Sequence, residues 1–124
     1  MSGHPLPAEL QEFLIKHIDS IAQLEALLLL REGSDAAWDV QTTAKRLYIG
    51  QQEAEEILAL LAAHGFIVLA ENGFRYRPQS RGLARMVDLL AEYYRRYLVP
   101  ITNLVHTKPR RIREFADAFK LRKE

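Results

Sequence analysis

The stretch from Asp39 to Pro78 places the strongest constraint on the fold, because its apolar and polar residues change pattern in a fixed order. A short helical pattern comes first, in which Ala44 and Leu47 lie three residues apart and therefore share one face. A brief connector, a longer helical pattern and two short extended runs follow. The predicted order is helix, turn, helix, hairpin.

The connector between the two helices is Tyr48-Ile49-Gly50. We expect Ile49 to point inward and Gly50 to supply the backbone angles that the corner needs, because glycine is conformationally permissive. The second helix carries one apolar stripe at helical spacing, and Gly65 is expected to end it in the left-handed conformation. The stripe consists of Ala54, Ile57, Leu58 and Leu61.

Two extended runs after this helix predict a β-hairpin. The run over 66–69 is apolar and partly β-branched, and Asn72-Gly73 is a strong hairpin signal because both residues tolerate positive φ. In the second run aromatic rings alternate with arginines, so rings and arginines should face opposite ways. That run is Phe74, Arg75, Tyr76 and Arg77, and Pro78 should end it because proline cannot donate to the ladder.

This pattern resembles the winged helix-turn-helix domains of small bacterial transcriptional regulators of the MarR and PadR kind. The resemblance rests on a small residue midway along the first helix, a leucine that closes it, apolar residues on the second helix, and a glycine and an apolar residue before the wing. Here those positions are Ala44, Leu47, Ala54, Leu58, Leu61, Gly65 and Phe66. The resemblance covers most of the chain. It implies a mainly α fold with a small β-hairpin wing, an extra N-terminal helix and a long C-terminal dimerisation helix, in a homodimer that binds double-stranded DNA and regulates transcription.

The length of 124 residues predicts one domain over 1–124. Within it we expect N-terminal helices over 7–32, the helix-turn-helix and wing over 39–78, a long helix over 80–106 and a basic amphipathic tail over 107–124. Ser20 followed by Gln23 predicts the start of a second N-terminal helix, and Ser80 can cap the long helix. Pro100 should kink or break that helix near Leu98.

The second N-terminal helix is apolar almost all round because of Leu29 and Leu30, which is typical of a helix in the middle of a core or an oligomer interface. Trp38 precedes the helix-turn-helix. Winged helices often have a short strand at this place that pairs with the wing. We expect Trp38 to pack beneath the wing rather than to stack on a base, since large aromatic residues beside a core are usually buried.

The long helix carries apolar residues spaced four, three, four, three and four apart, which is the spacing of a heptad seam. The seam residues are Leu83, Val87, Leu90, Tyr94, Tyr97 and Ile101. We predict that they form a homodimer interface, because a small domain can rarely cover two long apolar helices alone. The alternative is that the seam packs on the first helix of its own chain.

Charge is distributed unevenly although the net charge is only +1. Exposed cations and amides near the turn and on the wing could contact double-stranded DNA through phosphates and base edges. These candidates are Lys45, Arg46, Gln51, Gln52, Arg75, Arg77 and Arg81. The second helix instead carries Glu53, Glu55 and Glu56, which would repel phosphates. The chain could therefore be a protein-interaction module that uses this acidic helix and binds no DNA. A further alternative is that the arginines only pair with these glutamates or merely keep the wing soluble.

Other classes of function find little support in the sequence. The chain has no cysteine, and its histidines, His4, His17, His64 and His106, are scattered and not at ligand spacing from acids. We therefore expect no metal site, no cofactor and no enzyme activity. No secretory signal and no apolar run of about 20 residues is visible, so we expect no membrane span and a cytoplasmic location.

Overall fold

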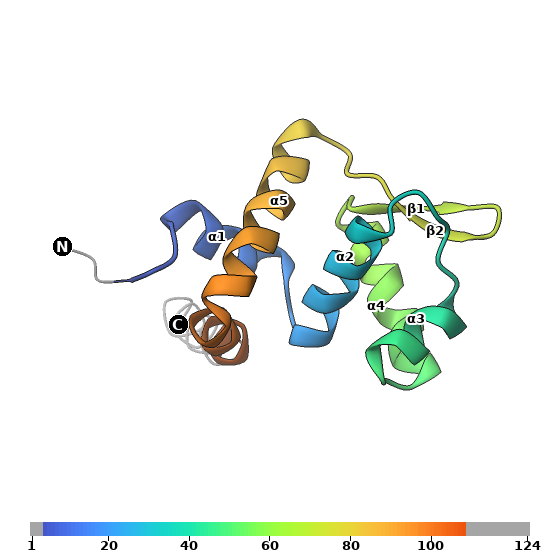
Figure 1. The fold of residues 1–124 in the computed structure, drawn as a ribbon, viewed down its shortest axis with the longest axis horizontal. Coiled ribbons are helices and arrows are strands. Elements are labelled where there is room, and N and C mark those ends of the chain that lie inside the picture. Colours follow the sequence, from blue (N-terminus) through green and yellow to red (C-terminus); the bar gives the residue numbers. More distant parts are fainter. Residues whose placement is uncertain (1–3, 109–124) are drawn as a thin grey trace, which may run out of the picture.

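The computed structural model describes residues 4–108, in which helices dominate and two short strands form an antiparallel sheet (Figure 1). A further helical segment at 98–108, called here the C-terminal segment, follows the named elements. The named elements are α1 (Ala8–His17), α2 (Ile21–Glu32), α3 (Val40–Leu47), α4 (Gln51–Ala63), β1 (Ile67–Ala70), β2 (Gly73–Tyr76) and α5 (Arg81–Arg96). The predicted tail falls almost entirely outside the described residues.

Helix α2 lies at the centre of the molecule, with α1 and α5 on one side and α3, α4 and the hairpin on the other (Figure 1). Leu24, Leu27 and Leu30 of α2 are completely buried. This position within the core confirms the prediction drawn from its nearly continuous apolar surface. Burying this helix against both halves of the molecule supplies much of the hydrophobic stabilisation that joins them.

The starts of α2 and α5 are capped as the sequence predicts. The Ser20 hydroxyl accepts from the Gln23 backbone N–H at 3.1 Å, and the Ser80 hydroxyl accepts from the Leu83 N–H at the same distance. The Gln23 side chain also fixes the corner before α2, because its amide donates to the His17 carbonyl at 2.9 Å and accepts from the Asp19 N–H at 2.7 Å. Gln23 is buried, so these bonds satisfy a polar group inside the protein.

The corner between α3 and α4 differs from the sequence prediction. Tyr48, not Gly50, adopts the left-handed conformation, with φ of 57° and ψ of 45°. The position follows from how α3 closes: the Ile49 N–H donates to the Ala44 carbonyl at 3.1 Å, which requires the residue just past Leu47 to turn left-handed. Gly50 has extended angles, φ of −69° and ψ of 157°, and precedes α4.

The hairpin turn also lies one residue earlier than predicted. Ala70 pairs with Gly73, so the turn consists of Glu71 and Asn72, and only Gly73 has a positive φ, of 136°. A strand segment at Trp38 explains this glycine. The alanine Cβ that Gly73 lacks would lie 2.6 Å from the Trp38 carbonyl carbon and oxygen.

Trp38 pairs with the hairpin, as expected. Its N–H donates to the Phe74 carbonyl and its carbonyl accepts from the Phe74 N–H, both at 2.8 Å. The indole Nε1–H donates to the Gly33 carbonyl at 3.0 Å, and the ring packs against the core. The end of α4 confirms another prediction, because Gly65 has φ of 85° and the Phe66 N–H donates back to the Leu61 carbonyl at 3.0 Å.

The predicted long helix is two helices, with the break at Tyr97, close to the predicted Leu98. Ile101, the last residue of the predicted dimer seam, lies in the C-terminal segment beyond this break. Val87, Leu90 and Ile101 are each completely buried within the single chain, which corrects their assignment to a dimer interface. These three residues belong to the core of the chain itself, while Leu83, Tyr94 and Tyr97 remain half-buried.

Candidate nucleic-acid interface

Four of the predicted DNA contacts lie around the corner between α3 and α4. Lys45 and Arg46 are in the last turn of α3, and Gln51 and Gln52 begin α4. All four side chains are exposed. The short α3 places its cations next to the start of α4 because α3 and α4 pack directly against each other.

The hairpin presents the wing arginines on its outer face. Arg75 and Arg77 are exposed, whereas Phe74 and Tyr76 between them are half-buried, which confirms the predicted alternation of rings and arginines. Figure 1 shows the hairpin projecting at the same end of the molecule as α3 and α4. The corner and the wing therefore lie at the same end of the molecule, and we use the name corner–wing face for the exposed polar residues that they carry, which are Lys45, Arg46, Gln51, Gln52, Arg75 and Arg77.

Arg81 does not join this face. It is exposed at the start of α5, which Figure 1 places far from the turn between α3 and α4. Sequence spacing could not reveal this separation, because it depends on how the chain crosses from β2 to α5. The structure thus brings six of the seven predicted contact residues to one end of the molecule.

The cations of the corner–wing face remain available to a partner. Within residues 4–108, Lys45, Arg75 and Arg77 form no ion pair and no side-chain hydrogen bond, and Arg46 lies over the Trp38 ring at 5.4 Å. Some cations elsewhere are paired, such as Arg31 with Asp88 at 2.9 Å. Exposed, unpaired cations are the groups that phosphate contacts require.

The acidic residues of α4 are exposed as well. Glu53, Glu55 and Glu56 form no ion pair in the part of the chain that the structure describes. The interpretation that the wing arginines are neutralised by these glutamates therefore finds no support in the geometry. Both charges stay open to solvent on neighbouring surfaces.

One exposed aromatic residue was missed by the sequence reasoning. Tyr48, at the corner itself, has 95% of its side chain exposed. The sequence favoured Gly50 for whatever backbone angles the corner needs, and no periodic pattern distinguishes a solvent-facing tyrosine in a connector from an inward one. Its place between the α3 cations and the start of α4 puts it on the corner–wing face.

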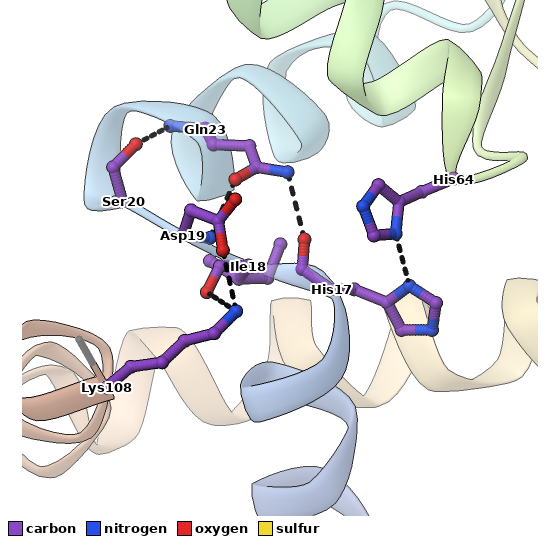
Figure 2. A network of polar contacts seen from close by, with 7 residues as sticks. All are labelled: His17, Ile18, Asp19, Ser20, Gln23, His64 and Lys108. Carbon is purple, nitrogen blue, oxygen red and sulfur yellow. Dashed lines mark hydrogen bonds and ion pairs between the residues drawn. The ribbon is translucent and has the colours of Figure 1, made fainter. Parts of the chain in front are cut away.

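A second missed feature lies at the junction of α1, α2 and α4 (Figure 2). His17 and His64, called here the histidine pair, meet with their Nδ1 atoms 2.8 Å apart. One ring must donate a proton and the other accept it, so the contact is lost if both are protonated. Phe13 and Phe66 pack on the His17 ring, with centroids 5.0 and 5.3 Å away. These histidines lie far apart in the sequence, so no local signal predicts their contact.

The environment of His17 favours its uncharged form. Burial, followed by the charges of His64, Lys16 and Lys108, lowers the pKa of His17 from 6.5 to about 4. Two imidazoles alone make an incomplete metal site, and no group of three or more His, Asp or Glu within residues 4–108 could hold a metal ion. The pair links the end of α1 to the end of α4 through this contact.

We expect stability to depend on pH through His17. Its folded pKa lies below the unfolded value, so its contribution is complete above about pH 6.5 and is lost as pH falls towards 4. Because the ring is partly exposed and screened, the loss should be about 1–2 kcal/mol in the free energy of unfolding. Urea titrations between these pH values measure it.

The matched variants are His17→Gln, which should flatten this pH dependence, and His106→Gln, which changes an exposed histidine and should preserve it. If His17→Gln keeps the wild-type slope between pH 6.5 and 4, His17 is not the group that titrates.

A cavity of about 370 Å³ opens between α2 and α5. Part of its polar lining is engaged: the Tyr94 hydroxyl donates to Glu25 at 2.9 Å, and Arg31 pairs with Asp88 beside it. Burial and the bond to Glu25 raise the pKa of Tyr94 to about 12. These contacts tie α5 to α2, and we assign the cavity no role in the chemistry of the corner–wing face.

In residues 4–108, none of the helices combines the length and apolar character needed to cross a membrane. Comparisons of the chain with protein-family models, with curated proteins and with solved structures find no match. The interpretation of the corner–wing face therefore rests on its geometry and charge.

Proposed function

We propose that this chain is a winged helix-turn-helix protein that binds double-stranded DNA and regulates transcription. The order of elements supports the proposal: α2, the Trp38 strand segment, α3, α4 and the β1–β2 hairpin follow one another as helix, strand, helix, helix and wing do in that fold. The observation that carries the proposal is the corner–wing face, where Lys45, Arg75 and Arg77 are exposed and unpaired at the same end of the molecule.

In this proposal the first turn of α4 enters the major groove. Gln51 and Gln52 are exposed there beside Glu53, and a glutamine amide can bond to adenine through a donor and an acceptor together. Lys45 and Arg46 contact phosphates on one side of the groove. Arg75 and Arg77 on the wing contact the backbone on the other.

The acidic surface of α4 limits how deeply the helix can enter. Glu53, Glu55 and Glu56 would approach phosphates if the whole helix lay in the groove, at an electrostatic cost. Entry by the first turn keeps most of these carboxylates away from the backbone, and the helix N-terminus itself attracts phosphate.

The proposal includes a homodimer, which would place two corner–wing faces about 34 Å apart on successive turns of DNA. The burial of Val87, Leu90 and Ile101 removes these residues from the interface. Apolar surface remains at the break after α5, where Leu98 is 51% and Val99 is 65% exposed, beside half-buried Tyr97.

Fluorescence anisotropy with labelled duplex DNA from upstream of the coding sequence tests this function. For each bound subunit, we expect Arg75→Ala/Arg77→Ala to weaken binding about 10- to 100-fold and to lower the slope of log affinity against log salt by about 2, because two phosphate contacts are lost per subunit. The control is Arg95→Ala/Arg96→Ala, which removes the same charge from exposed positions at the end of α5. Absence of wild-type binding at about 50 mM salt, or equal effects of the two double variants, would contradict the proposal.

The exposed and unpaired Glu53, Glu55 and Glu56 favour one rival function, a winged-helix module that docks on a basic protein surface. A chain that binds no DNA at low salt, and that loses a co-purified protein when these three residues become Gln, would support this alternative. A partner list that the three substitutions leave unchanged would count against it.

A further inference from the structure

We propose that the Tyr48 hydroxyl donates a hydrogen bond to a DNA backbone phosphate and thereby anchors the corner of the helix-turn-helix on duplex DNA. The inference rests on the proposed function and adds a neutral contact to its cationic ones.

The exposure of Tyr48 is the first observation. With 95% of the side chain in solvent, it is the most exposed large hydrophobic residue in the described part of the chain. Its side chain makes no hydrogen bond, ring contact or cation–π contact within residues 4–108, and only its backbone N–H is bonded, to the Lys45 carbonyl at 3.3 Å. Packing therefore gives no reason for a large aromatic ring at this position, since a side chain that buries nothing adds little to stability.

The backbone of Tyr48 is the second observation. Its φ of 57° is the only positive value among the non-glycine residues of 4–108. Glycine or asparagine adopts this conformation at lower cost, and the residue that closes a helix in this way is usually one of these two. The chain therefore places a tyrosine where folding favours a smaller residue, which is the situation in which a strained position points to function.

The surroundings of Tyr48 identify the partner. Lys45 and Arg46 in the preceding turn are exposed, and Gln51 and Gln52 follow it. The space around Gly50 is open, with nothing within 4 Å of where a Cβ would lie. An anionic ligand is favoured beside the two cations, and a tyrosine hydroxyl is one of the neutral donors that contact phosphate in DNA complexes. The left-handed turn directs the ring away from the protein, which allows the hydroxyl to reach a backbone beside the groove that α4 enters.

The test uses two variants of the whole chain and the same duplex DNA. Tyr48→Phe removes only the hydroxyl, and Tyr48→Asn removes the ring while keeping a residue that tolerates the left-handed backbone. For each bound subunit, we expect both to weaken binding about tenfold, the effect of one lost hydrogen bond to a charged group. Since Tyr48 carries no charge, the slope of log affinity against log salt should stay at its wild-type value, whereas Arg75→Ala should lower it by about 1 per bound subunit.

Thermal melting of both variants checks that the fold is intact. Asparagine relieves the backbone cost, so Tyr48→Asn should melt no lower than the wild type. Wild-type affinity in Tyr48→Phe overturns the inference, because the hydroxyl then makes no contact. A change in salt slope overturns it as well. If the wild type itself binds no DNA at low salt, the proposed function is wrong. If the wild type binds DNA and the Tyr48 variants bind equally well, only the inference about Tyr48 is wrong.

Discussion

Replacing Gly73 with alanine should lower the free energy of unfolding by about 2–4 kcal/mol, because two separate costs add. A φ of 136° is a conformation that residues with a Cβ rarely adopt. The new Cβ would also lie 2.6 Å from the Trp38 carbonyl group, and that contact is with backbone, which cannot rotate away as a flexible side chain can. Relief requires the Trp38 segment to separate from the hairpin.

Gly50→Ala is the matched control. Gly50 has extended angles and open space around it, so alanine fits without strain. Alanine restricts the unfolded chain, which stabilises the protein, but it is a poorer residue before a helix, and the two effects should leave stability within about 0.5 kcal/mol of the wild type. Equal destabilisation of both variants would show that the two sites are not distinguished by backbone conformation.

Urea unfolding measures both variants, and Trp38 provides a local probe. It is the only tryptophan in the chain, so its emission reports the bridge to Phe74 directly. We expect the emission of native Gly73→Ala to move towards that of an exposed indole, while Gly50→Ala leaves it unchanged. An unchanged spectrum with lower stability would place the strain elsewhere in the hairpin.

Local rules predicted the helices, the hairpin and several of their ends. The apolar stripes gave the helical spacing, Ser20 and Ser80 cap their helices, Gly65 closes α4, and Pro100 accompanies a break nearby. Each of these depends on residues close together in the sequence. These features could be predicted from the sequence because the hydrogen bond or steric clash that causes each one spans only a few residues.

The misplaced details depend on contacts between distant segments. The hairpin register is set jointly with the Trp38 segment. The fold therefore requires a glycine at position 73 because the Trp38 backbone approaches it closely, rather than because of the turn itself. The left-handed residue at the corner is Tyr48, because α3 closes there. The sequence instead favoured Gly50 for the unusual backbone angles of the corner, because glycine is conformationally permissive. The histidine pair joins α1 to the end of α4, and no spacing within either segment indicates it.

The candidate site likewise contains features that local residues predict and features that depend on contacts between distant segments. Alternation in β2 correctly predicted that Arg75 and Arg77 face solvent, because a strand has a fixed period of two. The position of Arg81 away from the corner depended on the path of the chain into α5. The heptad spacing identified apolar residues correctly but could not decide which surface covers them, and the break at Tyr97 lets the chain bury three of them itself.

We expect Asp19→Ala to lower stability by about 2–3 kcal/mol, and more than Lys108→Met does. Lys108 is almost fully buried, and its Nζ donates to the Ile18 carbonyl at 2.9 Å and to the Asp19 carboxylate at 2.7 Å (Figure 2). Removing Asp19 leaves a buried ammonium with a single neutral acceptor. Replacing Lys108 with methionine keeps the apolar stem and removes the charge itself. The Ile18 carbonyl then loses its hydrogen bond from Lys108, at a cost of about 1 kcal/mol.

The double variant should therefore be no less stable than Asp19→Ala alone, a non-additivity that measures the coupling between the two groups. Urea unfolding of the four proteins completes the cycle. The pair Glu9 and Arg85 is the control: it is exposed and 3.8 Å apart, so Arg85→Ala should change stability by less than about 0.5 kcal/mol. If the two single effects add, the ammonium of Lys108 is not buried against Asp19.

The same bond should affect the histidine pair. The Lys108 charge is one of the influences that lower the pKa of His17, and the loss of that charge should raise this pKa and move the acid loss of stability to a higher pH. Lys108 holds the C-terminal segment on the corner between α1 and α2, and His17 links the same corner to the end of α4. Attachment of that segment and the protonation of His17 are therefore coupled, and Lys108→Met tests the coupling through the pH dependence that it leaves behind.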